Sequence, residues 1–438
     1  MHPFRLFALI GLVTAQTASA ASPLEAKIQS ALSYLQAHQT SGNEAAYERG
    51  QWPTKVTSTI PSVIGVGRYN VPYDEPTAFG AASISGILAE IYQVDSSYTS
   101  IPAMIKKTKA GFSNYRTDSV FHFYPAKDFQ GHQVRGPRFM HLKPRWYGFT
   151  NTPPDADTTS VAYLLLAYDR AIDLGTSPLR SGFDIPHETA EEYTAARDLG
   201  RNPHIYNAMH GNGNTGAFLT WLYDEKNPEM PRYYFASPDQ GTRIPFNKND
   251  VDCVVNANVL KMLTATNRTN TPGYADSCNY LNDVAARDAY YRCGMYYPSR
   301  YALPYAMASA IKLGVSCLKP SQNLVVDQIL ARQREDGSWK NHWKARPDYV
   351  QSTAWALNTL LLLGDAQNPA HRLAAQRGLN FLVAQSTRDS KGRVYWQGEV
   401  FYAAIFIARF PVVWRSDAYT TATAVKAMTL AKKKWNLR

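Results

Sequence analysis

Six segments of the chain share one pattern, in which a start rich in Pro, Ser, Asp or Asn precedes small and apolar residues at helical spacing. They begin at Tyr73, Pro153, Asn247, Tyr297, Arg346 and Arg415. Each start offers an N-cap residue and a proline or acid in the first turn, as helix starts require. Small residues dominate the first turns and Leu or Ile the later ones. We therefore expect these helices to pack closely on both sides, as an inner layer.

More amphipathic stretches lie between these segments and suit an outer layer. They span residues 24–39, 101–115, 277–291, 324–334 and 373–385. Inner and outer helices that alternate along a chain are the sequence form of an α/α toroid. Evidence for strands is thin. The sequence thus predicts an all-α fold, a single (α/α)6 toroid over residues 21–438.

The first residues have the pattern of a secretory signal peptide. Arg5 supplies a positive flank, residues 6–13 form an apolar run, and Ala18-Ser19-Ala20 is an A-x-A cleavage site. We expect cleavage after Ala20, with Ala21 as the alternative, and a secreted or periplasmic protein. Beyond this segment no apolar stretch approaches the length that spans a bilayer, so no transmembrane segment is expected.

Four cysteines, Cys253, Cys278, Cys293 and Cys317, lie in one part of the chain. An even count in an exported protein favours two structural disulfides, with three pairings open. The alternative is four buried free thiols. No CxxC or HxxxH spacing supports a zinc site, so no metal is expected.

The net charge and the content of aromatic residues limit the kinds of binding partner that the protein can have. Lys and Arg number 46 against 35 Asp and Glu, a net charge of +11. This favours an anionic partner or milieu, but no compact basic tract supports nucleic-acid binding. The 28 Tyr, 17 Phe and 9 Trp suit a large ring-lined cavity. We expect a monomer that takes a small hydrophobic or anionic substrate into a central cavity and needs no cofactor.

Two kinds of motif carry a resemblance to a known family. Gln333, Gly337 and Trp339 are similar to the Q-x(2–5)-G-x-W repeat of squalene and terpene cyclases. Looser echoes of that repeat are Gln39 with Gly50 and Trp52, and Gln385 with Gly392 and Trp396. Asp155-Ala-Asp157-Thr158-Thr159 resembles the D-x-D-D or D-x-D-T-T acid motif of class II terpene cyclases, and Asp250-Val-Asp252-Cys253 resembles it with Cys in the last place. The chain thus resembles the toroid superfamily of terpenoid cyclases and protein prenyltransferases.

The resemblance implies a chemistry for these aspartates. Asp157, the middle acid of the motif, would protonate an alkene or epoxide, with Asp155 and Thr158 tuning it and Asp250 and Asp252 in support. Such a carboxylic acid must stay protonated, which requires burial or a like-charged neighbour. Aromatic faces would stabilise the carbocations that follow, without a metal. The alternative is that aspartates at helix starts only cap free N–H groups, which fits Asp155 and Asp250 better than the two others.

Two other function classes stay open. An exported (α/α)6 glycoside hydrolase or polysaccharide lyase acting on an acidic glycan could pair Asp157 with Asp252 across a groove. Cations and rings just before the first acid motif could hold an anionic group, unless they form only a solvated loop: Arg138, His141, Arg145, Trp146 and Tyr147. The polar insert 207–216, with His210, is a turn or an anion-binding nest. The third class is a non-catalytic binding scaffold, which need not bury a protonated acid.

Overall fold

A computed structural model describes residues 22–44, 46–59, 68–125, 152–222, 244, 248–341, 348–405 and 409–437. The predicted signal peptide lies outside these residues. The structure is mostly helical, which confirms the coarse form of the all-α prediction.

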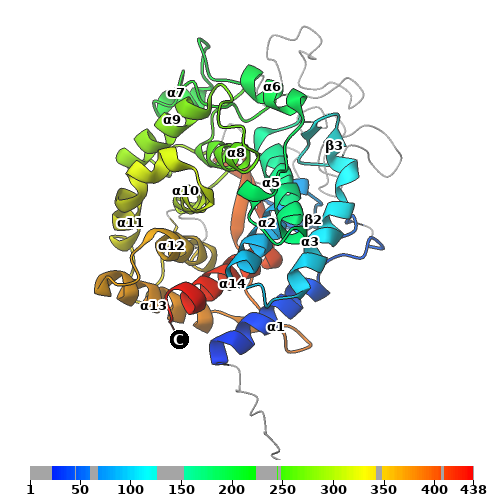
Figure 1. Cartoon of the computed structure of the whole chain (residues 1–438), viewed down its shortest axis with the longest axis vertical. Helices are drawn as coiled ribbons and strands as arrows, with labels where there is room; N and C mark the ends of the chain where they lie inside the picture. Colours follow the sequence, from blue (N-terminus) through cyan, green and yellow to red (C-terminus); the bar gives the residue numbers. More distant parts are fainter. Residues whose placement is uncertain are drawn as a thin grey trace, which may run out of the picture.

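The inner helices form a closed ring. They are α2 (Ala78–Val94), α5 (Ala156–Asp173), α8 (Cys253–Ala265), α10 (Ala302–Leu313), α12 (Val350–Leu363) and α14 (Asp417–Lys434). Each packs against the next, and α14 returns to pack against α2 (Figure 1). Every segment that the sequence assigned to the inner layer contains one of these helices. Their burial supports that assignment, since α14 is buried on all sides from Ala418 to Ala431.

Further helices lie outside this ring. They are α1 (Pro23–Ala37), α3 (Ser100–Ala110), α6 (His187–Ala195), α9 (Tyr274–Ala286), α11 (Gln322–Leu330) and α13 (Pro369–Ala384). Helix α1 packs on α14, α3 on α2, α9 on α8, and both α11 and α13 on α12. The sequence analysis missed α6, because only Thr189 and Tyr193 of this short helix are buried and they make a weak apolar stripe. Shorter helical turns are α7 (Ile205–Met209), η2 (Phe112–Tyr115), η4 (Pro178–Arg180) and η7 (Ser316–Ser321).

A four-stranded antiparallel sheet corrects the expectation that strands play little part. Its order is β2 (Pro72–Asp74), β1 (Lys55–Ser58), β8 (Arg409–Arg415) and β7 (Val400–Ile405). Strand β1 pairs with β8 from the far end of the chain, Val56 lying opposite Trp414. Strands this short take their stability from such non-local pairing, which periodicity does not reveal. Two small ladders complete the list: β3 (Arg116–Thr117) with β4 (Val120–Phe121), and β5 (Thr387–Arg388) with β6 (Val394–Tyr395).

The β7–β8 hairpin covers the end of the ring where the inner helices begin. The Tyr402 ring stacks 5.0 Å from Phe123 and meets Tyr297, just before α10, edge-on at 5.7 Å. The Phe401 ring stacks 4.4 Å from Tyr419, in the first turn of α14. In Figure 1 the hairpin, in orange, crosses the middle of the ring. The hairpin therefore closes one end of the space inside the ring.

The segments that resemble Q-x-G-x-W repeats tie outer helices to the ring. The Trp52, Trp339 and Trp396 indoles are buried, and each donates its N–H to a carbonyl in the last turn of an outer helix. Gln333 donates to the carbonyls of Gly337 at 3.0 Å and Ala374 at 2.8 Å. Gln39 makes the same pair of bonds, to Gly50 at 3.0 Å and Met104 at 2.8 Å. The two fuller motifs thus have one hydrogen-bonding pattern, whereas the third shares only its tryptophan.

Two disulfides are present, as predicted. They join Cys253 to Cys293 and Cys278 to Cys317, which selects one of the three open pairings. The alternative of four free thiols is wrong. Among the described helices, none has the length and apolar content needed to cross a membrane.

Candidate functional site

A small cavity of about 80 Å³ lies inside the ring. All the inner helices contribute to its wall. Its largest side chains are aromatic: Phe79, Tyr168, Tyr297, Tyr305, Trp355 and Tyr419. This volume is below the roughly 300–1,000 Å³ of typical small-molecule sites, but the lining has their character, mostly apolar and aromatic with a few placed polar groups.

Asp157 lies directly behind this wall, in the first turn of α5. Its side chain is nearly fully buried. Asn258 of α8 donates its amide N–H to Oδ1 of Asp157 at 2.7 Å, and the Tyr297 hydroxyl donates to Oδ2. Asn258 and Tyr297 both line the cavity. The carboxyl group of Asp157 is therefore held by two wall residues rather than by backbone N–H groups of its own helix.

Burial shifts the pKa of Asp157 into the range that a general acid needs near neutral pH. Burial raises the pKa of Asp157 to about 7, while the hydrogen bonds from Tyr297 and Asn258 act to lower it. A carboxyl group with this pKa is protonated in a large fraction of molecules near neutral pH, where an ordinary aspartate is almost fully ionised.

Asp155 is the N-cap of α5. Its Oδ1 accepts the Thr158 backbone N–H at 2.6 Å, and its Oδ2 is buried without a hydrogen-bond partner among the described residues. Burial, with a smaller contribution from the nearby charge of Asp157, raises the pKa of Asp155 to about 8. Thr158 is fully buried and is not among the residues that line the cavity. Asp155 thus combines the capping role with a protonated carboxyl group at neutral pH.

The second acid motif sits differently on its helix. Asp250 accepts the Thr220 hydroxyl at 2.5 Å and the Tyr296 hydroxyl at 2.8 Å, and burial raises its pKa to about 6. The cap of α8 is Asp252, not Asp250 as the capping alternative supposed. The register differs because α5 begins one residue after the first aspartate of its motif and α8 one residue after the second.

Asp252 has four backbone N–H groups on its two oxygens. Its Oδ1 accepts Val254 N–H at 2.8 Å and Val255 N–H at 3.2 Å, and its Oδ2 accepts Met295 N–H at 2.6 Å and Tyr296 N–H at 3.1 Å. Burial raises the pKa of Asp252 to about 6, and these donors act to lower it, since they favour the carboxylate. At neutral pH Asp252 is mainly ionised and its lone pairs are occupied.

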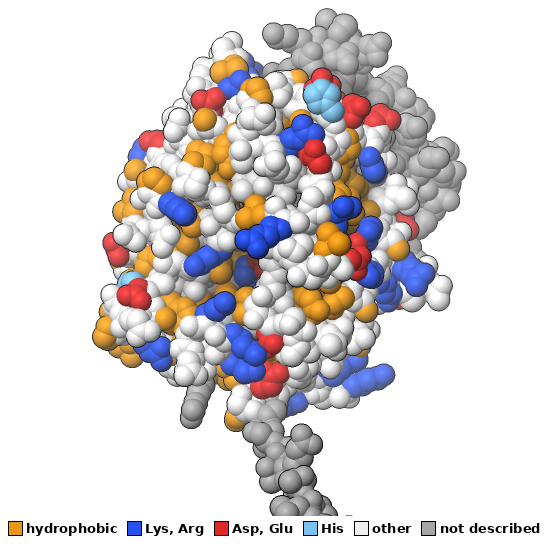
Figure 2. Space-filling model, in the orientation of Figure 1, with side chains coloured by type: hydrophobic (Ala, Val, Ile, Leu, Met, Phe, Trp, Pro, Cys, Tyr) orange, Lys and Arg blue, Asp and Glu red, His pale blue; other side chains and the backbone are white. Residues whose placement is uncertain are grey.

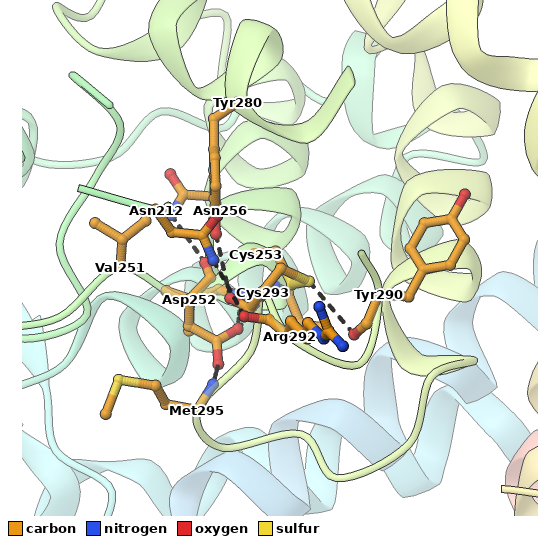
Figure 3. The surroundings of a disulfide bond; sticks show 12 residues. Asn212, Val251, Asp252, Cys253, Asn256, Tyr280, Tyr290, Arg292, Cys293 and Met295 are labelled. Atoms are coloured by element: carbon orange, nitrogen blue, oxygen red, sulfur yellow. Dashed lines mark hydrogen bonds between the residues drawn. A yellow bond between two sulfur atoms is a disulfide. The ribbon is translucent and has the colours of Figure 1, made fainter. Parts of the chain in front are cut away.

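The Cys253–Cys293 disulfide reinforces the same contact. It joins the first residue of α8 to the segment that carries Met295 and Tyr297 (Figure 3). The Cys253 backbone N–H also donates to the Cys293 carbonyl at 3.2 Å. Disulfide and Asp252 together fix this segment on α8. Tyr297 is thereby placed against Asp157, 140 residues away in sequence.

The other predicted binding residues do not join this site. His210 follows α7 and lines a separate depression with Arg292 and Arg300. The insert around it is a turn, in which the Thr215 N–H donates to the buried Asp198 carboxylate at 2.8 Å. Arg138, His141, Arg145, Trp146 and Tyr147 lie outside the described residues.

Sequence reasoning missed Tyr297, Asn258 and a charged group at the far end of the cavity. That group is formed by Glu90, Lys261 and Lys426, each in the later part of an inner helix. The available signal was a polar or charged residue inside a helix otherwise built for burial. Such a residue needs a partner in the interior, but the sequence does not show which.

Comparisons with known proteins bear on the fold. No protein-family model matches the sequence, and no curated protein matches it either. The type II terpene cyclase MstE from Scytonema, without ligand, has a TM-score of 0.55 and 16% identity over 93% of this chain and 98% of that chain. A variant of that enzyme in complex with its substrate, geranylgeranyl dihydroxybenzoate, has a TM-score of 0.53 and 14% identity over 93% of this chain and 97% of that chain. A protein from Actinoplanes has a TM-score of 0.54 and 13% identity over 93% and 99%.

These likenesses extend over nearly the whole of each chain and agree with the ring of helices around a central cavity. The identities are low, so they concern the fold and not the activity. The chain has the toroid fold of the terpenoid cyclases.

Proposed function

We propose that the protein is a terpene cyclase-like enzyme that protonates a terpenoid substrate with Asp157. One observation carries this proposal. A buried carboxyl group whose pKa is raised to about 7 lies directly behind the wall of an aromatic cavity. Protonation of an alkene needs an acid that keeps its proton at neutral pH and is shielded from water, and burial provides both.

The cavity suits the cations that protonation would create. The rings of Phe79, Tyr297, Trp355 and Tyr419 line it, and aromatic faces attract positive charge. The β7–β8 hairpin closes the end near Asp157. A closed end limits access of water, which would otherwise capture the carbocation.

We assign different roles to the four aspartates. Asp157 is the acid, and Asp155 is its buried neighbour, whose own pKa of about 8 keeps it protonated at neutral pH. Asp250 holds the Tyr296 hydroxyl. Asp252 is a positioning residue, since its oxygens are occupied by the backbone of the segment that presents Tyr297.

The proposal extends to architecture and location. The inner helices and the helices outside them are consistent with an (α/α)6 toroid over residues 21–438, in which α6 would complete the outer layer. Residues 1–20 would direct export, and the two disulfides suit an oxidising compartment. We expect the mature protein to be secreted or periplasmic and to act as a monomer without a cofactor.

The acidic-glycan alternative finds less support. A glycosidase needs two available carboxyl groups across an accessible groove. Asp252 is fully buried with both oxygens occupied, and Asp157 lies behind an aromatic wall. A binding scaffold, in turn, has no need of a protonated acid at this position.

The test is a product assay on the purified mature protein. Prenyl substrates with and without a head group are incubated with wild-type protein, Asp157→Asn and Asp157→Glu, and products are analysed by mass spectrometry and NMR. We expect the wild type to form cyclic isomers that Asp157→Asn does not form. Equal product formation by wild type and Asp157→Asn would rule out Asp157 as the acid.

A further inference from the structure

The cavity ends in a charged group whose members come from five different inner helices. We call it the Glu90 cluster: Glu90 of α2, Tyr168 of α5, Lys261 of α8, Ser309 of α10 and Lys426 of α14. Both lysine ammonium groups form ion pairs with the Glu90 carboxylate. The Ser309 hydroxyl donates to Glu90 at 2.7 Å and the Tyr168 hydroxyl donates to it at 3.2 Å.

This cluster lies far from the acid end. Phe79, beneath the hairpin, and Glu90 are about 16 Å apart along α2 at about 1.5 Å per residue. Glu90, Tyr168 and Ser309 line both the inner cavity and a second, outer cavity. Lys261 lines only the inner cavity and Lys426 only the outer one. The Glu90 cluster is therefore the partition between the two cavities.

The outer cavity is positively charged. Lys312 and Lys434 line it with Lys426, and Glu90 is the one acid in its described lining. In Figure 2, lysine and arginine side chains surround a hollow near the middle of the ring. Lysines near helix C-termini also complement the helix dipoles, which accounts for Lys312 and Lys434 but not for Lys261 or Lys426 buried at the partition.

The charges of the cluster do not balance. One carboxylate faces two lysines, so with both lysines protonated one positive charge is left over in a largely buried place, and the cost of burying it lowers the pKa of Lys261. The Tyr305 ring, 4.6 Å from the Lys426 ammonium, offsets part of this cost. Burial works to raise the pKa of Glu90, but its attraction to Lys261 and Lys426 holds the pKa below its ordinary value, so Glu90 stays ionised.

The donors of the cluster are not all used. An ammonium group has three N–H donors. Lys261 uses two, to Glu90 and to Ser309 at 2.8 Å, and Lys426 uses two, to Glu90 and to the Tyr305 hydroxyl at 3.1 Å. Each lysine thus keeps one donor without an acceptor among the described residues. Lys261 lines the inner cavity, so its free donor, together with one excess positive charge, suits one oxygen and the single charge of a carboxylate there.

We propose that the Glu90 cluster binds the carboxylate head group of an amphipathic substrate whose prenyl chain occupies the inner cavity. This inference rests on the proposed function, because it names the substrate class of the same cavity. Glu90 sets the charge preference. A diphosphate carries more negative charge than the one excess positive charge can neutralise, whereas a carboxylate leaves the cluster neutral.

Binding of unreactive ligands tests this inference apart from catalysis. Phytanic acid, its alcohol phytanol and phytanyl diphosphate share a saturated chain that cannot be cyclised. Their dissociation constants can be measured by quenching of tryptophan fluorescence, because Trp355 lines the cavity. We expect wild-type protein to bind the acid about tenfold or more tightly than the alcohol, as a charge-assisted hydrogen bond would give.

Variants then locate the effect. Lys261→Met should bind phytanic acid and phytanol equally, whereas Lys261→Arg should keep the preference for the acid. Glu90→Gln should shift the preference from the acid toward phytanyl diphosphate. Lys106→Met, an exposed lysine of α3 paired with Asp173, is the matched control and should behave as wild type. If Lys261→Met fails to fold, the ratio of the dissociation constants of acid and alcohol for wild-type protein still tests the head-group assignment.

The outcomes separate the two proposals. Equal binding of acid and alcohol by wild type, or an unchanged preference in folded Lys261→Met, would overturn the head-group assignment alone. If none of the three ligands binds, the cavity does not accept prenyl chains, and the proposed function fails with it.

Discussion

Asp157 and Asp252 occupy matching places in two similar motifs, yet the structure predicts opposite consequences when each is replaced. Asp252→Ala removes the cap of α8, which costs about 1 kcal/mol. It also leaves the buried N–H groups of Met295 and Tyr296 without an acceptor, at about 1–3 kcal/mol each. The expected loss is about 3–7 kcal/mol, a large part of the roughly 5–15 kcal/mol that stabilises typical folded proteins.

Asp157→Asn leaves no backbone group unsatisfied. The amide oxygen can still accept the bond from Asn258, and the amide N–H can donate to the Tyr297 oxygen. The substitution also removes a buried group that resists ionisation. We expect its free energy of unfolding to lie within about 1 kcal/mol of the wild-type value, as for changes that create neither a cavity nor an unpaired polar group.

Urea unfolding followed by tryptophan fluorescence, with the product assay on the same samples, measures both effects. The reasoning predicts a folded but inactive Asp157→Asn and an unstable Asp252→Ala. A loss above about 2 kcal/mol in Asp157→Asn would show that the hydrogen bonds of this aspartate serve mainly the stability of the fold. A loss below about 1 kcal/mol in Asp252→Ala would show that its four hydrogen bonds contribute little.

Three further predictions concern stability. The pKa of Asp157 is raised to about 7 in the folded state, so its contribution to the free energy of unfolding is fully present below about pH 4 and is lost as the pH rises through 7. Wild type should therefore lose more stability than Asp157→Asn between about pH 4 and 7, and parallel curves of stability against pH would contradict this. The Cys253–Cys293 and Cys278–Cys317 bonds close loops of sequence separation 40 and 39, so replacing either pair by serine should lower the free energy of unfolding by about 4 kcal/mol. At a temperature where both variants are folded, only loss of the Cys253–Cys293 bond should lower activity. Gly337 and Gly392 both have positive φ, but a Cβ at Gly337 would lie 2.4 Å from a backbone oxygen of α13, whereas a Cβ at Gly392 would meet open space. Gly337→Ala should therefore unfold at a lower urea concentration than Gly392→Ala, and equal unfolding midpoints would refute the steric argument.

The helices could be predicted from the sequence because their causes are local. Cap residues such as Thr77 and Asp155 precede runs of small residues, and the structure shows both side chains accepting first-turn N–H groups. The sheet could not be predicted in the same way. Strand β1 is only four residues long, and its pairing with β8 joins residues at opposite ends of the chain.

The site shows the same division between local and distant causes. The sequence indicated Asp157 as the candidate acid because its motif is contiguous. It could not show that Tyr297 and Asn258 hold the carboxyl group, since these contacts span 140 and 101 residues. Nor could it show that Glu90 meets Lys426, which follows it by 336 residues. Separations of this size carry no periodic signal, so only the folded ring reveals them.

The direction of the inner helices explains most of the charge distribution but leaves Asp157 as an exception. Acids near helix N-termini and lysines near C-termini are both stabilised by the helix dipole. Asp155 and Asp252 follow this rule, because Oδ1 of each accepts first-turn N–H groups. Asp157 does not, because its oxygens face side chains of α8 and of the segment before α10. Asp250 is also buried with hydroxyl donors, but those donors do not line the cavity, whereas both donors to Asp157 do. That Asp157 is buried with a raised pKa and held by two residues of the cavity wall is the strongest argument that its role is chemical.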